Sequence, residues 1–441
     1  MLPQISATMH TVLTTTTEAT ATSLQYAKRP DRAKFTPSTL VQTLVFGWLA
    51  DPQATVEQLA QMAGRLGVDV SPQAIDQRFT PATATLLQQV LTASIQHVVS
   101  ADPVAIPILQ RCTSVRVHDS TTSGLPDALA TTWSGCGNAT GRGTAGLKCG
   151  VQVDLLTGAL CGLDLADGRA SDHTLAVQHA ALPAGSLRLA DLGFYDLEVL
   201  ATLDATGASW LSRLQTNSRL TLPGQPERPL VDTLAALGSV SDWDGPVLVG
   251  KGGRVAARLI ARRVPQEVAD ERRRIRAAAK DKGRAPAKAA LALAAWTVLI
   301  TNAPVALLSL EEALVLLRLR WQIDLLFKLW KSHGKVAEWR TANPARILCE
   351  VYAKLLALVV QQWLIVASGW GDPERSLFKA AQVVRSYAAE LASAFGDEDQ
   401  FVTVLRNMAR VLQRTARMNK RRTTPTTAQR LCALTAGSAQ A

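Results

Sequence analysis

The spacing of hydrophobic side chains changes abruptly along this chain, and that change limits the folds open to it. From about residue 36 to 100 apolar residues recur at helical spacing. From about residue 113 they alternate with a period of two, in SVRVHDS, LKCGVQVDLL, ALCGLDLA, SLRLADL and ASWLSRLQ. The stretches TLAVQHAAL and LEVLATLDA, between the later strands, have helical patterns. Three adjacent strands followed by alternating helices and strands predict a mixed α/β sheet.

Other segments flank or interrupt this sheet pattern. Residues 1 to about 25 are rich in Thr and predict a loose tail, whereas residues from about 309 to 415 are again helical. Residues about 215 to 295 hold short strand-like pieces and the charged segment ERRRIRAAAKDKGRAPAK, which we interpret as an insertion with its own small β structure and a basic helical arm. TVEQLAQMAGRLGVDVSPQAIDQRF, in the first helical region, fits a helix-turn-helix and a plain helical hairpin alike.

Charge and cysteine content narrow the possible partners. The 441 residues include 47 Lys and Arg against 36 Asp and Glu, and the resulting charge of +11 favours a polyanion such as nucleic acid or an anionic membrane surface. Residues 289 to 310 are uncharged and long enough to span a bilayer, but Pro304 and several polar side chains favour a strand, WTVLIT, between two helices. We therefore expect no membrane partner. The six cysteines lack zinc-ligand spacing and suggest reduced intracellular thiols.

Two predicted strands end in a carboxylate. Val115, Val117 and Asp119 share one face of the first strand. Leu187, Leu189 and Asp191 do the same in the other. Open α/β sheets bind ligands at the carboxyl ends of their strands, so both acids are candidate site residues. Each acid alone is also explained as the cap of a following turn or helix.

A third acid lies in a predicted helix over residues 313 to 335. At roughly 100° per residue one face of this helix is basic, with a single embedded acid. That face holds Leu317, Arg320, Asp324, Lys328, Lys331 and Lys335. The alternative is a solvated face with ion pairs from Asp324 to Arg320 and to Lys328, each contributing about 0.3–0.5 kcal/mol. If the three acids converge, they repel one another unless a cation binds, and an oxygen-rich site of this kind suits Mg²⁺ or Mn²⁺.

The segment RLRWQIDLLFKLWKS resembles the signature of the insertion-sequence-four family of DDE transposases. That signature is Tyr, two residues, Arg, three residues, Glu, six residues and Lys. Leu317, Arg320, Asp324 and Lys331 stand at these positions with matching spacing. VHDST around Asp119 resembles the first catalytic aspartate motif of the family, and ADLGFYD around Asp191 resembles the second.

The resemblance implies a multidomain α/β protein with a ribonuclease-H-like catalytic core, a β-rich insertion and flanking helical regions. The implied division has five parts: a helical DNA-binding domain at 1–110, core residues 111–214, the insertion at 215–295, the rest of the core at 296–345, and a helical region at 346–441 for DNA binding or dimerisation.

The implied activity is cut-and-paste DNA transposition, through a hairpin at the element end. Asp119, Asp191 and Asp324 would bind two Mg²⁺ or Mn²⁺ ions, and basic residues would hold DNA phosphates. The implied partners are double-stranded DNA, as terminal inverted repeats and target, and a second copy of the chain on that DNA. The implied location is the bacterial cytoplasm, at the nucleoid when bound to DNA.

Two positions depart from the family signature. Leu317 replaces Tyr, and Asp324 replaces Glu with a side chain shorter by about 1.5 Å. A misplacement near 1 Å can cost about a hundredfold in rate. The alternatives are therefore a catalytically inactive DNA-binding protein derived from a transposase, and a ribonuclease-H-like nuclease that cuts without joining.

A second basic feature lies near the C-terminus. Arg406, Arg410 and Arg414 recur every fourth residue, and Arg417, Lys420, Arg421 and Arg422 follow without an intervening acid. Such a stripe repels itself, so we expect it to bind DNA phosphates, with a plain solvated face as the alternative. Lys148, in an early strand, fits either a phosphate contact or a solvated position.

Overall fold

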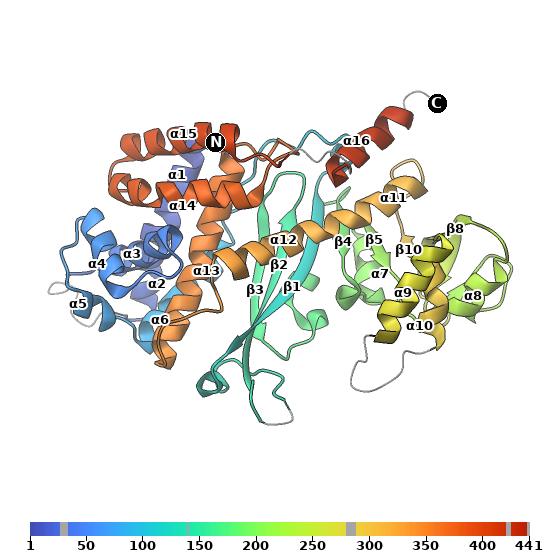
Figure 1. Ribbon diagram of the computed structural model, residues 1–441, viewed down its shortest axis with the longest axis horizontal. Coiled ribbons are helices and arrows are strands. Elements are labelled where there is room, and N and C mark those ends of the chain that lie inside the picture. The colour runs from blue at the N-terminus through green and yellow to red at the C-terminus, as the bar shows by residue number, and fades with distance from the viewer. Residues whose placement is uncertain (27–33, 139–140, 279–287, 420–424, 439–441) are drawn as a thin grey trace.

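The protein, described here from a computed structural model, is a mixed α/β molecule with one large sheet and many helices. The structure describes residues 1–26, 34–138, 141–278, 288–419 and 425–438. Figure 1 shows an elongated molecule with a helical lobe at one end, the sheet in the middle, and a smaller lobe of strands and helices at the other end.

The sheet has ten strands in the order β3-β2-β1-β4-β5-β10-β9-β8-β6-β7. The strands are β1 (Val115–Leu125), β2 (Ala145–Asp154), β3 (Leu160–Asp167), β4 (Leu187–Ala190), β5 (Ser209–Arg213), β6 (Arg219–Thr221), β7 (Arg228–Pro229), β8 (Asp242–Val249), β9 (Val255–Arg263) and β10 (Trp296–Thr301). β1, β2 and β3 are antiparallel neighbours, whereas β4 runs parallel to both β1 and β5.

The strands of the insertion do not form a separate sheet, which corrects the sequence-based interpretation. β9 pairs with β10, and β10 pairs with β5, so the insertion extends the central sheet at its edge. The physical reason is that β10, the predicted strand WTVLIT, presents hydrogen-bonding groups on both sides. Its side chains Leu299 and Ile300 are fully buried. The helices of this half are α7 (Leu197–Ala205), α8 (Leu230–Ala236), α9 (Gln266–Ala278) and α10 (Lys288–Ala292).

The N-terminal lobe is helical from its first residues. Its helices are α1 (Leu2–His10), α2 (Thr17–Ser23), α3 (Pro37–Ala50), α4 (Val56–Arg65), α5 (Pro72–Asp76) and α6 (Pro81–Ser94). The predicted loose tail was wrong, because Ile5, Met9, Val12 and Leu13 are fully buried in the core of this lobe. A few apolar residues at helical spacing were enough to anchor a Thr-rich segment.

The possible helix-turn-helix corresponds to α4 and α5. Thr55 and Gln58 form a capping box at the start of α4, and Gly67 follows α4 with φ +79°. Ser71 caps α5, which is only five residues long. So short a second helix favours the plain hairpin over a helix that would lie along a DNA groove.

The C-terminal half packs a long central helix between the helical lobe and the sheet. Its helices are α11 (Leu310–Leu316), α12 (Trp321–Lys328), α13 (Pro344–Ala367), α14 (Leu377–Ala394), α15 (Glu398–Thr415) and α16 (Thr427–Ser438). Among the described residues, α13 alone is long and apolar enough to cross a membrane, but its apolar window is entirely buried inside the molecule. In Figure 1 it stands on the side of the helical lobe that faces the sheet.

The helix LEVLATLDA is confirmed as α7, but the helix predicted for TLAVQHAAL was wrong. That segment forms two short 3₁₀ turns, Asp172–Thr174 and Ala176–Gln178. Leu175 and Val177 are buried two residues apart, and both lie against the glycines of β2 and β3. This close approach to the sheet holds Leu175 in an extended conformation between the two turns, so packing overrides the helical pattern of the sequence.

Candidate active site

Strand register brings the first two predicted acids to one edge of the sheet. Val115 lies beside Leu187 and Val117 beside Leu189 in the parallel pairing of β1 with β4. The last pair is His118 with Ala190, so Asp119 and Asp191 follow at the same level. Because side chains alternate along β1, His118 points to the face covered by the 3₁₀ turns, where its Nδ1 lies 3.0 Å from the carbonyl oxygen of Val177. Asp119 points to the opposite face, toward α12.

The segment with the third acid is not one uniform α-helix, as the sequence pattern had predicted. Ser309 and Glu312 form the capping box of α11. A 3₁₀ turn, Leu317–Arg320, then leads into α12, and a π-helical turn, Leu329–His333, ends the run. Because these turns change the angle per residue, Leu317 is buried and does not belong to the exposed basic face. Figure 1 shows α12 crossing over the first strands of the sheet.

Arg320 contacts all three predicted acids. Its Nη1 donates a hydrogen bond to Oδ2 of Asp119 at 2.9 Å. Its Nε lies 3.8 Å from Oδ1 of Asp191, and its Nη2 lies 3.7 Å from Oδ2 of Asp324. The exposed fractions of the acid side chains are 16% for Asp119, 41% for Asp191 and 50% for Asp324. Asp119 therefore forms the floor of a site whose other two acids are open to solvent.

The surroundings of Asp119 raise its pKa to about 6. Burial is the main cause and the charges of Asp324 and Asp191 add to it, while the Ser120 N–H and Arg320 oppose the shift. Within the described ranges, no three acidic, His or Cys side chains are gathered closely enough to hold a metal ion as they stand. The guanidinium of Arg320 lies between the acids. The donor set of three carboxylates around one positive group nevertheless fits a hard divalent cation.

The predicted basic residues have different surroundings. Lys331 donates from Nζ to the carbonyl oxygen of Thr122 at 2.9 Å, so it lies against β1 three residues beyond Asp119. Lys328 is exposed on α12, and the proposed ion pair with Asp324 is not among the described interactions. Lys335 lies beyond the helix with φ +49° and pairs with Glu338 at 2.7 Å. Only Arg320 and Lys331 therefore lie at the site.

A cavity of about 580 Å³ lies beside α12 on the flank that carries Arg320. Its walls include Leu317, Leu325, Trp370 and Phe378. Its basic lining residues are Arg213, Arg318, Arg320, Arg375 and Arg430. Asp372 is the only acid among the described residues that line it. The charge and size of this cavity are suited to an anionic chain next to the three acids.

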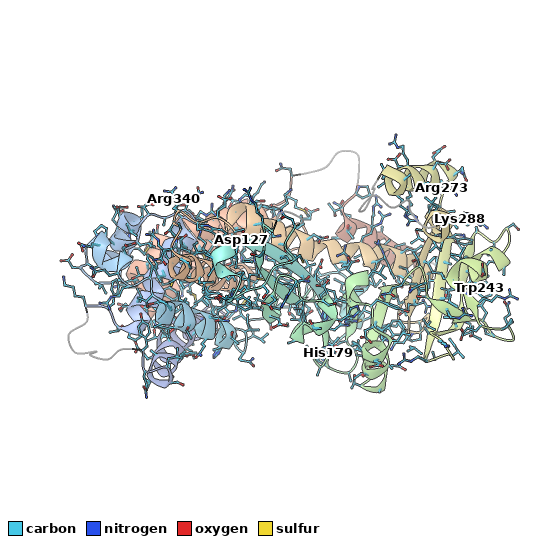
Figure 2. The ribbon with its side chains drawn as sticks, turned by 90° about the horizontal axis from the view of Figure 1, so that it is seen from below. Asp127, His179, Trp243, Arg273, Lys288 and Arg340 are labelled. Atoms are coloured by element: carbon cyan, nitrogen blue, oxygen red, sulfur yellow. The ribbon has the colours of Figure 1, made fainter. Side chains whose placement is uncertain are left out.

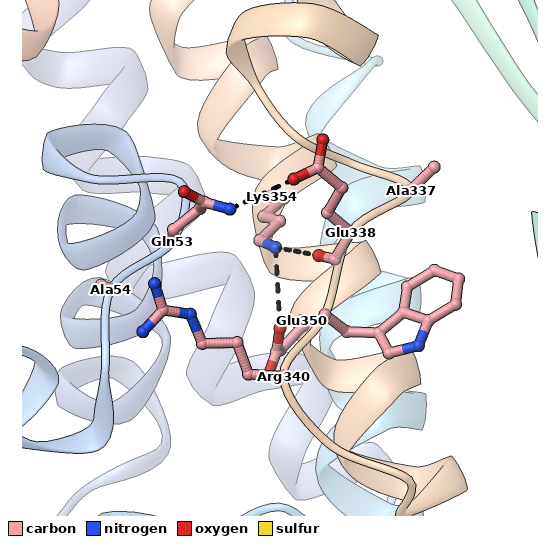
Figure 3. Close-up of a pocket in the computed structure, with 8 residues that line it drawn as sticks. Gln53, Ala54, Ala337, Glu338, Arg340, Glu350 and Lys354 are labelled. Atoms are coloured by element: carbon pink, nitrogen blue, oxygen red, sulfur yellow. Dashed lines mark hydrogen bonds and ion pairs between the residues drawn. The ribbon is translucent and has the colours of Figure 1, made fainter.

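A second cavity, of about 380 Å³, lies away from the acids at the junction with the helical lobe (Figure 3). Lys354 of α13 is buried at this cavity, and burial lowers its pKa. Its Nζ donates to the carbonyl oxygens of Glu338 at 2.6 Å and Lys335 at 3.3 Å. Gln53, from the turn after α3, donates to Glu338 at 3.1 Å. These contacts fix the chain that follows the α12 segment against the N-terminal lobe.

The C-terminal arginine stripe lies on α15, away from the three acids. Arg406, Arg410 and Arg414 are exposed, while Phe401, Leu405 and Met408 of the same helix are fully buried. No salt bridge of these three arginines occurs among the described residues. Arg417 pairs with Asp372 at 3.3 Å. The predicted extension to Lys420, Arg421 and Arg422 lies outside the described residues.

One polar cluster near the acids was missed by the sequence analysis. Lys148 of β2 is paired with Asp172 at 2.9 Å, so it is neither solvated nor free to hold a phosphate. The same carboxylate oxygen accepts a hydrogen bond from Oγ of Ser120 at 2.6 Å. Nothing in the local sequence indicates this contact: Asp172 lies two residues before the segment TLAVQHAAL, whose predicted helix does not form.

Comparison with known proteins decides the family of this chain. Residues 110–360, more than half of the chain, match the family described as "Transposase DDE domain". The chain belongs to this family. It is therefore a DNA transposase, an enzyme of the DDE type, and DDE transposase domains use divalent metal ions.

Curated relatives are transposases of bacterial insertion sequences. The transposase for element IS231F of Bacillus thuringiensis subsp. israelensis is 24% identical over 436 residues, covering 92% of this chain and 89% of that protein. The transposase for IS1151 of Clostridium perfringens is 25% identical over 276 residues, covering 58% and 57%. A solved structure of the piggyBac transposase synaptic complex with hairpin DNA covers 93% of this chain and 83% of its own, at 10% identity and a TM-score of 0.44.

Proposed function

We propose that Asp119, Asp191 and Asp324 are the three catalytic acids of this transposase. The observation that carries the proposal is their convergence on Arg320 from two strand ends and one helix that are far apart in the sequence. The shorter Asp324 side chain, in place of the Glu of the insertion-sequence-four signature, is compatible with this site because Arg320 also reaches it. We assign the chain to that family on the same residues.

The order of the first five strands supports a ribonuclease-H-like core. β3, β2 and β1 form an antiparallel meander, and β4 and β5 continue the sheet parallel to β1. The first acid then lies on the central strand and the second just past its parallel neighbour. We retain the five-part division at residues 110, 214, 295 and 345 as part of this proposal, with the insertion joined to the core sheet.

Asp119, Asp191 and Asp324 would hold Mg²⁺ or Mn²⁺, as two ions. Bound there, the ions would lower the pKa of the attacking hydroxyl and stabilise the leaving oxygen. Arg320 would then pair with a DNA phosphate in place of the acids, since a guanidinium binds phosphate and carboxylate oxygens with the same geometry. Lys331, held at the end of β1, would contact a neighbouring phosphate.

The proposed reaction is a series of phosphodiester exchanges. Water first cleaves one strand at the element end and leaves a 3′-hydroxyl. This hydroxyl attacks the opposite strand and forms a hairpin, which water reopens. The same hydroxyl then attacks target DNA, and a 3′-oxygen of the target departs. Both joining steps form one phosphodiester for each one broken, so they need no energy-supplying cofactor.

The remaining surfaces suggest how DNA is held. The N-terminal lobe would recognise terminal inverted repeats, while Lys328, Lys335 and the α15 stripe of Arg406, Arg410 and Arg414 would contact DNA backbone. Two copies of the chain would pair the two element ends, in the bacterial cytoplasm at the nucleoid. Support comes from the net charge of +11 and from the basic cavity beside the acids.

The test uses the purified protein, Mg²⁺ and duplex DNA that carries the repeats flanking its gene. A denaturing gel should resolve nicked, hairpin and target-joined products. Binding without cleavage would identify an inactive DNA-binding derivative. Cleavage without joining to target would identify a nuclease. Either result would overturn the proposed reaction.

A further inference from the structure

Asp172 lies at a junction between the two strands that carry the first two acids. Its Oδ1 accepts a hydrogen bond from Oγ of Ser120 at 2.6 Å and is paired with Nζ of Lys148 at 2.9 Å. Ser120 follows Asp119 on β1, and Lys148 lies on the adjacent β2. The side chains of Lys148 and Asp172 are only 12% and 26% exposed, so this is a largely enclosed contact.

The contact reaches the acids through Ser120. The backbone N–H of Ser120 donates to Oδ1 of Asp119 at 2.8 Å, while its hydroxyl donates to Asp172. Ser120 is thus held by its side chain on one face of β1, and its amide orients the Asp119 carboxylate. A rotation of Ser120 would turn this N–H away from Asp119.

The same carboxylate also lies against the turn that follows β4. A Cβ atom on Gly193 would lie 2.7 Å from Oδ2 of Asp172, so only glycine fits there without a shift. Gly193 is two residues beyond Asp191. Asp172 therefore accepts a hydrogen bond from the residue after Asp119 and lies against the turn two residues beyond Asp191.

We propose that Asp172 is a positioning residue that fixes Asp119 and Asp191 relative to each other for metal binding, through Ser120 and the Gly193 turn. The inference rests on the proposed role of the three acids as metal ligands. Its physical basis is mutual repulsion: two carboxylates on separate strands move apart unless their supports are rigid. Lys148 compensates the charge of Asp172, which lets a third carboxylate lie close by without adding to that repulsion.

The test measures binding of Mn²⁺ alone, by loss of the electron paramagnetic resonance signal of the free ion, to the full chain without DNA. Asp172→Ala should weaken binding by about 10- to 100-fold, as removal of supporting groups around metal ligands commonly does. Ser120→Ala should weaken it in the same direction. The double variant should bind no more weakly than Asp172→Ala alone, because one contact cannot be lost twice.

Two further variants make the outcome decisive. Asp167→Ala is the matched control, since Asp167 is also half-buried and accepts a hydrogen bond from the backbone of Ser134, at 2.9 Å. It should leave Mn²⁺ binding unchanged. Asp119→Ala is the reference, and unchanged binding in that variant would refute the proposed metal site itself.

Thermal melting identifies any variant that fails to fold, and the Ser120→Ala variant, which removes one hydroxyl, keeps the test available in that case. If Asp119→Ala weakens binding but Asp172→Ala does not, the positioning role is wrong while the metal site stands. If Asp172→Ala abolishes binding while Ser120→Ala has no effect, Asp172 does not act through Ser120, and the proposal is equally overturned.

Discussion

Arg320 sets the charge balance of the site. In the metal-free chain it neutralises part of three clustered carboxylates, with its closest contact to Asp119 at 2.9 Å. A divalent ion bound at the proposed site would compete with this guanidinium for the same oxygens. Arg320 therefore has two proposed partners, one after the other. It pairs with the acids before metal binds and with a DNA phosphate afterwards.

Replacing Arg320 with Ala should strengthen Mn²⁺ binding in the absence of DNA. The variant leaves three repelling carboxylates without their cation, and partly exposed ion pairs contribute up to about 1 kcal/mol each, so a gain of roughly tenfold is expected. Calorimetric titration with Mn²⁺ measures it. Arg318→Ala is the control, because Arg318 lines the same cavity and has no described contact with the acids. Weaker binding in Arg320→Ala would show that Arg320 supports the metal site.

The raised pKa of Asp119 makes stability depend on pH. The carboxyl group titrates near its ordinary value of 3.8 when unfolded and at about 6 when folded, so the folded chain holds its proton more tightly. Its contribution to stability is complete below the unfolded pKa and is lost as the pH rises through about 6. Melting curves of the metal-free protein should show this loss, and Asp119→Asn should remove it. An identical pH profile in both proteins would contradict the assignment.

At the scale of elements, the segment from α11 to the π turn links the site to the rest of the molecule. Its 3₁₀ turn buries Leu317, and its end is held by Lys354 of α13. α15 is a simpler element: one face is buried, and the other carries three exposed arginines at every fourth position. An unpaired stripe of this kind is self-repelling, and DNA phosphates would relieve that repulsion.

Changing Arg406, Arg410 and Arg414 together to Ala should weaken DNA binding without unfolding the protein. If each contacts one phosphate, the slope of log affinity against log salt should become less steep by about 3. Fluorescence anisotropy with labelled duplex DNA gives this slope. Arg254→Ala is the control, because Arg254 is exposed but paired with Glu198 at 2.9 Å. An unchanged slope in the triple variant would assign the stripe to solvent.

The elements differ in how well the sequence predicted them. Strands with alternating apolar residues, such as β1, were predicted because side-chain alternation is a local property. The sequence indicated two acids at strand ends and a third on a helix, but it left their convergence as a condition. The turns around Asp172 were not predictable, because they form against Gly150 and Gly162 of distant strands. The contact of Arg320 with all three acids likewise depends on tertiary packing.

At the scale of the whole molecule, basic groups are spread over both ends. Figure 2 shows Arg340 at the helical end and Arg273 and Lys288 at the opposite end. The three acids lie between these ends, where α12 crosses β1. In a duplex bound along this length, phosphates on both sides of the site would contact basic residues of the protein.

DNA binding by the full chain should therefore depend strongly on salt. With about six phosphate contacts, log affinity should fall against log salt with a slope near −5. Titrations with labelled duplex DNA over a range of salt concentrations measure the slope. A flat response would contradict binding through phosphates and would leave the net charge of +11 without this explanation.

The most direct test of the central claim is DNA cleavage by Asp324→Ala, measured with duplex DNA that carries the repeats flanking the gene, with DNA binding assayed in parallel. The account predicts that cleavage is abolished while affinity for DNA stays within about twofold of the wild type, because Asp324 supplies a metal ligand and no phosphate contact. Asp324→Glu then reports on position: activity rises if α12 is placed for the longer side chain and falls if it is placed for Asp. Full cleavage by Asp324→Ala would contradict the claim that this residue completes the catalytic site.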